Sequence, residues 1–95
     1  MSTSDPSPAR FPLGRLVATP NALSRLDIHD VLAGLIRHQS GDWGELDEAD
    51  RLENESSLLQ GSRLLSAYTA RNGVKFWIIT EASRDITTVL LPEDY

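Results

Sequence analysis

The stretch SRLLSAYTARNGVKFWIITEASRDITTVLL, residues 62–91, decides the fold class of this chain. Its runs of apolar and β-branched residues predict three strands, over 62–69, 74–81 and 86–91. Asn72-Gly73 stands between the first two runs, and Asn-Gly is the strongest short-range signal for a β-hairpin. The middle run contains Phe76-Trp77-Ile78-Ile79, which is apolar on both faces. We therefore expect it to be a central strand of an antiparallel sheet.

The residues before these strands predict two helices. The first has a single apolar stripe with helical spacing, made of Ile28, Val31, Leu32, Leu35 and Ile36. Asp27 is its expected N-cap, and Ser40-Gly41 ends it. The second helix is expected over 48–60, with Asp47 as N-cap and Gly61 at its C-terminus. Its stripe is thinner, so we expect weaker packing.

The order of these elements predicts an α+β fold, β-α-α-β-β-β, over a single domain of residues 13–95. Residues 13–19 supply a short first strand, and Thr19-Pro20 begin a helical turn over 21–26. The natural arrangement is an antiparallel three- or four-stranded sheet with two helices packed on one face. Residues 1–12, rich in Ser and Pro, are expected to be a disordered tail. The expected core comprises Leu16, Ile28, Val31, Leu32, Leu35, Ile36, Leu52, Leu59, Leu65, Phe76, Ile78, Val89 and Leu91.

Composition excludes several classes of protein. The 95 residues suit one small domain, and the absence of cysteine rules out disulfides, thiolate catalysis and zinc fingers. The net charge of −5 argues against a general nucleic-acid binder, which needs a basic face. No apolar run approaches the roughly 20 residues of a membrane span, and no targeting signal is visible. We expect a cytoplasmic protein.

The negative charge is concentrated between Asp42 and Glu55. This acidic segment holds seven of the fourteen acids and one base, Arg51, and therefore carries more than the whole net charge of −5. One interpretation is an ordinary solvated helix face, with acids near a helix N-terminus. The other is a docking surface for a basic protein partner, a class that includes proteins whose basic face binds nucleic acid. The candidate partner-binding residues are Asp42, Trp43, Glu45, Asp47, Glu48, Asp50 and Glu53.

Trp43 stands out in this segment because it lies between Gly41 and Gly44. Tryptophan is costly to expose and usually packs onto a core. An exposed tryptophan, however, is a common anchor in interfaces. The sequence is compatible with both interpretations.

Catalytic and metal-binding patterns are not supported by the sequence. The acids and glycines near Asp42 do not follow the spacing of a calcium loop. His29 and His38 fall on opposite sides of one helix, and His38 near Asp42 is better explained by the helix dipole. No serine is expected beside a histidine, and no nucleophile elbow or phosphate-binding loop is present. We expect a protein that is not an enzyme and has no metal or cofactor.

Three stretches, RLVATPNAL, RHQSGDWGELDEADRLEN and GSRLLSAY…GVKFWIITEASRDITTVLLPEDY, closely resemble a group of small bacterial proteins carried by plasmids and integrated elements. The most specific parts are H-x-S-G-D-W-G, from His38 to Gly44, and the ending TT-x-LLPEDY. The resemblance covers 13–95 and implies an accessory gene of a mobile element. Such genes often encode regulators, toxin–antitoxin components or inhibitors of host defence, and it supplies no catalytic residues.

Two alternatives to an acidic docking protein remain. The element order resembles that of RelE/ParE-like toxins, whose ribonuclease members act through basic and tyrosine side chains on the sheet. Candidates for that role are Arg63, Tyr68, Arg71, Lys75 and Arg84. The net negative charge fits RNA binding poorly. The third possibility is a homodimer joined through the exposed side of the sheet.

Overall fold

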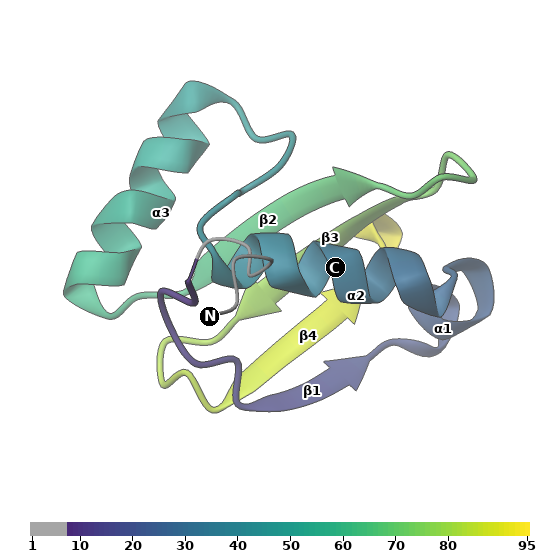
Figure 1. The fold of residues 1–95 in the computed structure, drawn as a ribbon, viewed down its shortest axis with the longest axis horizontal. Coiled ribbons are helices and arrows are strands. Elements are labelled where there is room, and N and C mark those ends of the chain that lie inside the picture. Colours follow the sequence, from purple (N-terminus) through teal and green to yellow (C-terminus); the bar gives the residue numbers. More distant parts are fainter. Residues whose placement is uncertain (1–7) are drawn as a thin grey trace, which may run out of the picture.

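The computed structural model, which describes residues 8–95, is an α+β fold built on one four-stranded sheet (Figure 1). Its elements are β1 (Arg15–Ala18), α1 (Pro20–Arg25), α2 (Ile28–Gln39), α3 (Glu48–Gln60), β2 (Leu64–Thr69), β3 (Lys75–Thr80), β4 (Ile86–Leu90) and a 3₁₀ turn, η1 (Pro92–Asp94). The strand order is β1-β4-β3-β2. The predicted fold class, the element order and the internal position of β3 are confirmed.

The sheet is mixed rather than wholly antiparallel, because β1 pairs with β4 in the parallel direction. Figure 1 shows the reason: α2 carries the chain back to the end of the sheet where β1 begins. Strand β2 therefore starts at that end and runs in the direction of β1. Two hairpin connections reverse the chain twice, so β4 runs parallel to β1 as well.

Helix α2 covers one face of the sheet, and the hydrophobic core lies beneath it. Of the predicted core, the residues confirmed as buried are Leu35, Phe76, Ile78, Val89 and Leu91. Gly34 brings the helix close to the sheet, since a Cβ there would lie 3.0 Å from the Phe76 ring. The core prediction is wrong for six residues of β1, α2 and α3, because their side chains are exposed: Leu16, Ile28, Leu32, Ile36, Leu52 and Leu59.

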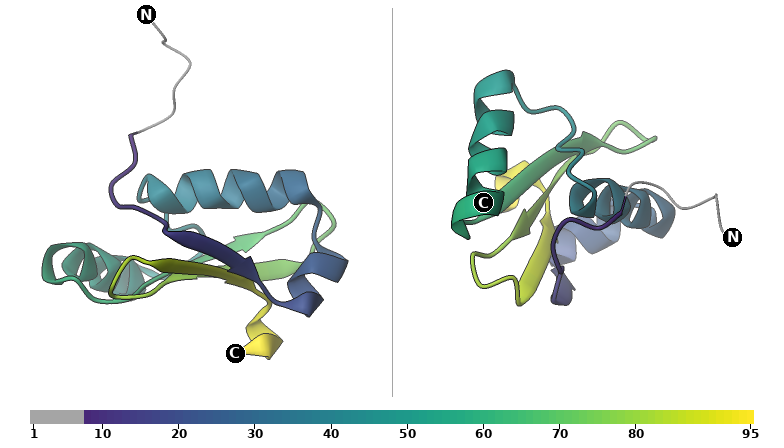
Figure 2. Two further views of the ribbon diagram at one scale, coloured as in Figure 1. Left: turned by 90° about the horizontal axis from the view of Figure 1, so that it is seen from below. Right: turned by 60° about the vertical axis from the view of Figure 1, so that its left-hand side comes forward.

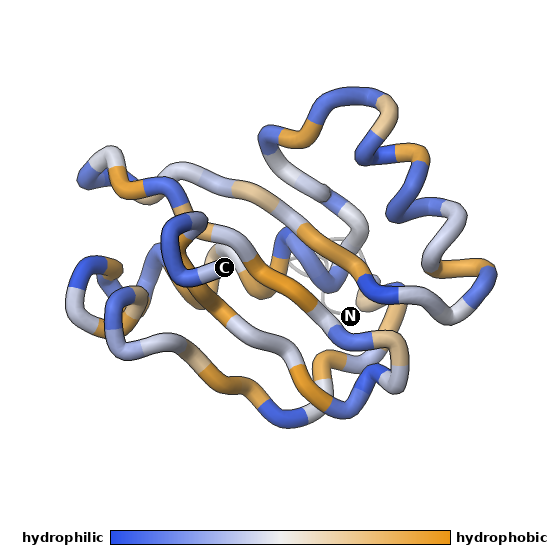
Figure 3. The backbone as a smooth tube through the Cα atoms, turned by 180° about the vertical axis from the view of Figure 1, so that it is seen from behind, coloured by the Kyte–Doolittle hydropathy of each residue, from blue (hydrophilic) through white to orange (hydrophobic). Residues whose placement is uncertain are grey.

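Helix α3 does not share the face covered by α2. Figure 2 shows it at the edge of the sheet, beside β2. Its backbone carries mainly hydrophilic residues with isolated hydrophobic positions (Figure 3). The side chains that it buries are polar, Asn54 and Ser57. A helix with so little apolar surface gains little from lying flat on a sheet, which explains why the expected two-helix layer does not form.

The predicted tail boundary after Pro12 is wrong for the last residues of that segment. The Arg10 N–H donates to the Gln39 carbonyl, and the Phe11 side chain is buried. The Gln39 side chain donates in turn to the Phe11 carbonyl. The folded domain therefore begins before residue 13. Residues 1–7 of the predicted tail lie outside the described residues.

The C-terminal residues cover part of the sheet face opposite α2 (Figure 2). The Tyr95 ring meets Trp77 edge to face, with their centroids 5.7 Å apart. Asp94 accepts hydrogen bonds from the Thr19 hydroxyl and the Leu91 N–H, and these bonds lower its pKa. Within residues 8–95, no helix combines the length and the apolar character needed to cross a membrane.

Candidate functional site

The acidic segment, residues Asp42 to Glu55, divides into acids that hold the fold and acids that face solvent. Asp42 accepts two hydrogen bonds from Arg37, at 2.7 and 3.1 Å, and these lower its pKa. Glu55 accepts two from Arg10, at 3.0 and 2.9 Å, which likewise lower its pKa. Glu45 lies 3.6 Å from the Lys75 ammonium. These three acids are paired within the molecule and offer little charge to a partner.

The remaining acids lie on α3. Asp47 is the N-cap, as predicted, and accepts from the Asp50 N–H at 2.9 Å. Glu48, Asp50 and Glu53 are exposed. Within the described part of the chain, none of these three takes part in an ion pair. The free negative charge of the segment therefore lies at the N-cap and in the first two turns of α3.

Trp43 belongs to the core, since only 4% of its surface is exposed. Its ring stacks on Phe11 and meets His38 edge to face, with centroids 6.2 and 5.8 Å away. Its indole N–H donates to Glu55 at 2.9 Å. The interpretation of Trp43 as a surface anchor is wrong, because a docked partner would not reach the ring.

Residues 43–45 close the free edge of β2. The Ala67 N–H donates to the Trp43 carbonyl, and the Glu45 N–H donates to the Ala67 carbonyl. Gly44 makes this approach possible, since its φ is +77° and a Cβ would lie 2.0 Å from the Ala67 oxygen. The H-x-S-G-D-W-G motif thus has a structural explanation in this chain.

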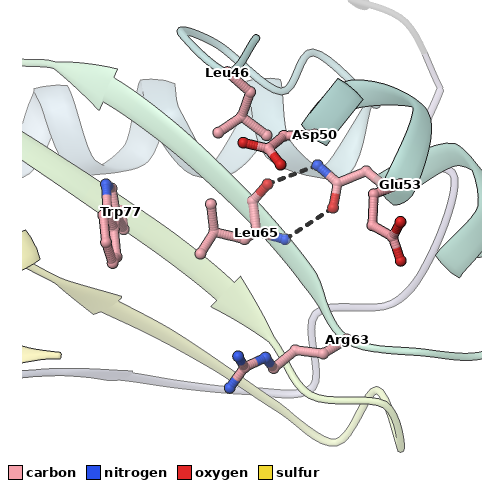
Figure 4. Close-up of a pocket in the computed structure, with 7 residues that line it drawn as sticks. Leu46, Asp50, Glu53, Arg63, Leu65 and Trp77 are labelled. Carbon is pink, nitrogen blue, oxygen red and sulfur yellow. Dashed lines mark hydrogen bonds between the residues drawn. The ribbon is translucent and has the colours of Figure 1, made fainter. Parts of the chain in front are cut away.

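A cleft between α3 and the sheet collects the groups most suited to binding (Figure 4). Its volume is about 370 Å³, and its lining residues are Leu46, Asp50, Glu53, Asn54, Arg63, Leu65 and Trp77. Asp50 and Glu53 are three residues apart on α3, so they lie on the same side of the helix. Trp77 and Leu65 point to the sheet face opposite α2. The cleft thus combines two carboxylates with an apolar floor.

The polar contacts that shape this cleft are specific. The Asn54 side chain donates to the Leu65 carbonyl at 2.7 Å and accepts from the Leu65 N–H at 3.1 Å. This pair of bonds fixes α3 against β2, because it reproduces the contacts of a neighbouring strand. Arg63 donates to the Tyr95 hydroxyl at 2.6 Å, and Figure 4 shows it at the end of the cleft away from Asp50. Its positive charge is therefore set apart from the carboxylate of Asp50.

Sequence reasoning placed Asp50 and Glu53 in the candidate site but missed its apolar floor. The signal was present in the strand pattern. Phe76 and Ile78 point toward α2, so Trp77 between them must point to the other face. A large aromatic on a face that no predicted helix covered indicated a site for a further segment or a partner.

His38 is also not where the sequence suggested. It does not contact Asp42; it is fully buried between Ser66 and Thr80, at 2.6 and 2.9 Å. The chain of bonds continues from Thr80 to Thr87 and ends at the Leu13 carbonyl. Because that carbonyl only accepts, each hydroxyl donates toward it. His38 must therefore carry its proton on Nε2 and accept from Ser66 on Nδ1.

This buried chain explains the state of His38 and its role. Burial, together with the nearby charge of Arg84, lowers the pKa of His38 to about 4. The expectation that no serine lies beside a histidine is wrong, since Ser66 does. Both side chains are fully buried, so this pair has no access to a substrate. Polar residues at inward-facing strand positions, Ser66, Thr80 and Thr87, were the available signal for such a network.

The basic and tyrosine residues proposed by analogy with RelE/ParE-like toxins make contacts within the fold. Tyr68 is buried, donates to the Asp42 carbonyl, and has a pKa raised to about 12 by burial. Arg71 pairs with Asp30, at 2.9 Å. Arg84 donates to the carbonyls of Ser62 and Ser57. With Arg63 on Tyr95 and Lys75 near Glu45, the five do not form an open basic site.

Comparisons with known proteins provide no relative from which a function could be transferred to this chain. No family model, curated protein or solved structure matches the chain. Within residues 8–95, no group of three His, Cys, Asp or Glu side chains is placed to hold a metal ion.

Proposed function

We propose that this chain is a non-enzymatic interaction protein that binds a basic segment of a protein partner in the cleft between α3 and the sheet. The observation that supports this most directly is that Asp50 and Glu53 line the same cleft as the half-buried Trp77. A lysine or arginine side chain fits this combination. Its aliphatic stem packs on an apolar floor, and its charge meets the carboxylates and the aromatic ring.

The free charge of α3 supports the same kind of partner. Asp47 and Glu48 extend the negative surface beyond the cleft, toward the N-terminus of the helix. A basic surface approaching from solvent is attracted by this field before it makes contact. A protein that uses its basic face to grip nucleic acid has such a surface. The proposed role is then that of a regulator or an inhibitor of host defence, which competes with nucleic acid for that face.

The test begins with a labelled peptide of alternating lysine and arginine, titrated into the full chain at physiological salt. NMR signals of the two indole N–H groups report on it. We expect the Trp77 signal to shift and the signal of the buried Trp43 to stay. Movement of neither signal, or of both equally, contradicts the proposed cleft.

The matched variants are two double charge reversals. Asp50→Lys with Glu53→Lys removes the cleft carboxylates, and we expect at least a tenfold loss of affinity for the peptide. Glu81→Lys with Glu93→Lys changes the net charge equally but outside the cleft, and we expect less than a threefold loss. Equal losses in both variants contradict a localised site. Asp47 is left unchanged because it caps α3.

Capture from nuclease-treated host lysate extends the test to a natural partner. A basic protein retained by the wild type and by Glu81→Lys with Glu93→Lys, but lost with the cleft variant, supports the proposal. Equal retention by all three chains contradicts it.

A further inference from the structure

The two edges of the sheet differ in a way that points to a second binding surface. Strand β2 is closed along its outer edge by the bridge between Gly44 and Ala67 and by the Asn54 amide. Strand β1 is the other terminal strand. The N–H groups of Arg15 and Thr19 donate toward β4, so by alternation the N–H and carbonyl groups of Leu16 and Ala18 face away from the sheet. The β1 edge is open for pairing.

An apolar groove of about 350 Å³ runs beside this edge, between β1 and α2. Its lining includes Leu16, Leu23, Ile28 and Leu32, all of them exposed. The groove holds no charged residue among its lining. The stripe of α2 therefore continues past the sheet onto a surface that nothing within residues 8–95 covers.

We propose that a second copy of this chain covers the groove, with the two β1 strands paired antiparallel about a two-fold axis at Val17. Leu16 of one copy then lies opposite Ala18 of the other, so the outward backbone groups satisfy each other in two symmetric pairs. The two sheets join into one of eight strands. Both grooves come to lie on the same face, where the exposed side chains of the two α2 helices approach one another.

Self-pairing fits this surface better than an unrelated partner does. A two-fold interface needs a patch that complements itself, and an apolar groove beside an open strand edge meets that requirement. The register places Arg15 opposite Thr19, so no like charges face each other. The acidic helix α3 lies at the opposite edge of the sheet, beside β2, which keeps the two negative surfaces apart (Figure 1).

The exposed apolar side chains supply a large part of the area that a standard dimer interface needs. Five large apolar side chains lie exposed on α1, α2 and β1: Leu16, Leu23, Ile28, Leu32 and Ile36. Together they offer on the order of 500 Å² per copy, and the β1 edge and the groove rim add to this, against about 800 Å² per partner in a standard interface.

The experiment measures the mass of the full chain by light scattering after size exclusion, at micromolar concentration. We expect twice 10.5 kDa for the wild type. Leu32→Lys should give a monomer, and its partly exposed side chain allows the lysine head to reach water without unfolding the chain. Leu59→Lys is the matched control, because Leu59 is a 90% exposed helical leucine on α3, and it should remain dimeric.

A second variant and a check of folding accompany this measurement. Ile36→Glu repeats the disruption at a second exposed position, and circular dichroism verifies that each variant is folded. A monomeric wild type overturns the proposal, and so does a dimer that persists in both folded α2 variants. Asp50→Lys with Glu53→Lys should remain dimeric, since the groove and the acidic cleft lie at opposite edges of the sheet.

Discussion

Helix α2 lies across one face of the sheet with Leu35 and His38 buried, whereas α3 stands beside β2 with only polar side chains buried. The first helix is held mainly by apolar contacts. The second is held by the bonds of Asn54, Glu55 and the Ser57 carbonyl, and by one partly buried leucine, Leu58, that packs on the cluster around Trp43. Each helix also leaves a different surface free. The exposed part of the α2 stripe forms an apolar groove, and α3 borders an acidic cleft.

The difference shows that how a helix is attached decides which surface it offers. A helix bound through apolar contacts exposes apolar side chains where its apolar face extends beyond the edge of the sheet. A helix bound through a few polar contacts keeps its charges in water. The comparison can be tested by weakening each attachment separately.

The largest effect is expected from the same leucine-to-alanine change made on the two helices. Leu35→Ala removes a buried side chain between α2 and the sheet, and should lower the free energy of unfolding by about 3–4 kcal/mol. Leu59→Ala, at an exposed position on α3, should change it by less than about 0.5 kcal/mol. Urea unfolding measures both values. Equal losses would show that Leu59 is packed as firmly as Leu35.

The next effect concerns the polar anchor of α2, the buried His38. Its folded-state pKa of about 4 lies below the ordinary value of 6.5, so the folded chain holds the neutral form. The unfolded chain binds a proton as the pH falls below 6.5. Stability present above pH 6.5 is therefore lost progressively, by about 3 kcal/mol in total as the pH reaches 4.

Urea unfolding at a series of pH values between 7 and 4.5 measures this loss. His38→Gln should be less stable at neutral pH but should show a flatter dependence on pH. His29→Gln, at the exposed histidine of the same helix, should keep the full dependence. A wild type whose stability is constant across this range would contradict the buried neutral state of His38.

A smaller effect is expected from the polar anchor of α3. Asn54→Ala leaves the Leu65 N–H and carbonyl at the β2 edge without their partner, and should cost about 2 kcal/mol. Asn54→Asp keeps the acceptor for the Leu65 N–H and should cost less. Hydrogen exchange at Leu65 should quicken in the alanine variant. Unchanged exchange there would show that α3 is fixed to the sheet by other contacts.

The sequence predicted the elements of this fold better than their attachment. Helix caps at Asp27, Asp47 and Gly61 and the hairpin at Asn72-Gly73 depend on local chemistry, and all of them are confirmed. The apolar stripe predicted helix α2. It did not predict how many of its side chains the sheet buries, because that number depends on where the short strand β1 lies. The parallel pairing of β1 depends on the path of the whole chain.

The candidate site was predicted only in part, for a similar reason. The clustering of acids in the sequence located Asp50 and Glu53 but did not separate them from Asp42 and Glu55. Those two acids are paired with Arg37 and Arg10, the second of which comes from a segment expected to be disordered. Trp77 joins the cleft through the pleat of β3 and the position of α3. Such long-range placements are not encoded in local spacing.

The smallest effect is expected from the exposed charges of α3, and it separates their role from that of the acids that hold the fold. Glu48→Gln with Glu53→Gln removes two charges that make no ion pair within residues 8–95, and should change the free energy of unfolding by less than about 0.5 kcal/mol. Urea unfolding beside the wild type measures this value. A loss above about 1 kcal/mol would mean that these carboxylates stabilise α3 itself, for example through its dipole. If no such loss is measured, the exposed carboxylates of α3 do not stabilise the fold, and a role in binding explains their clustering better.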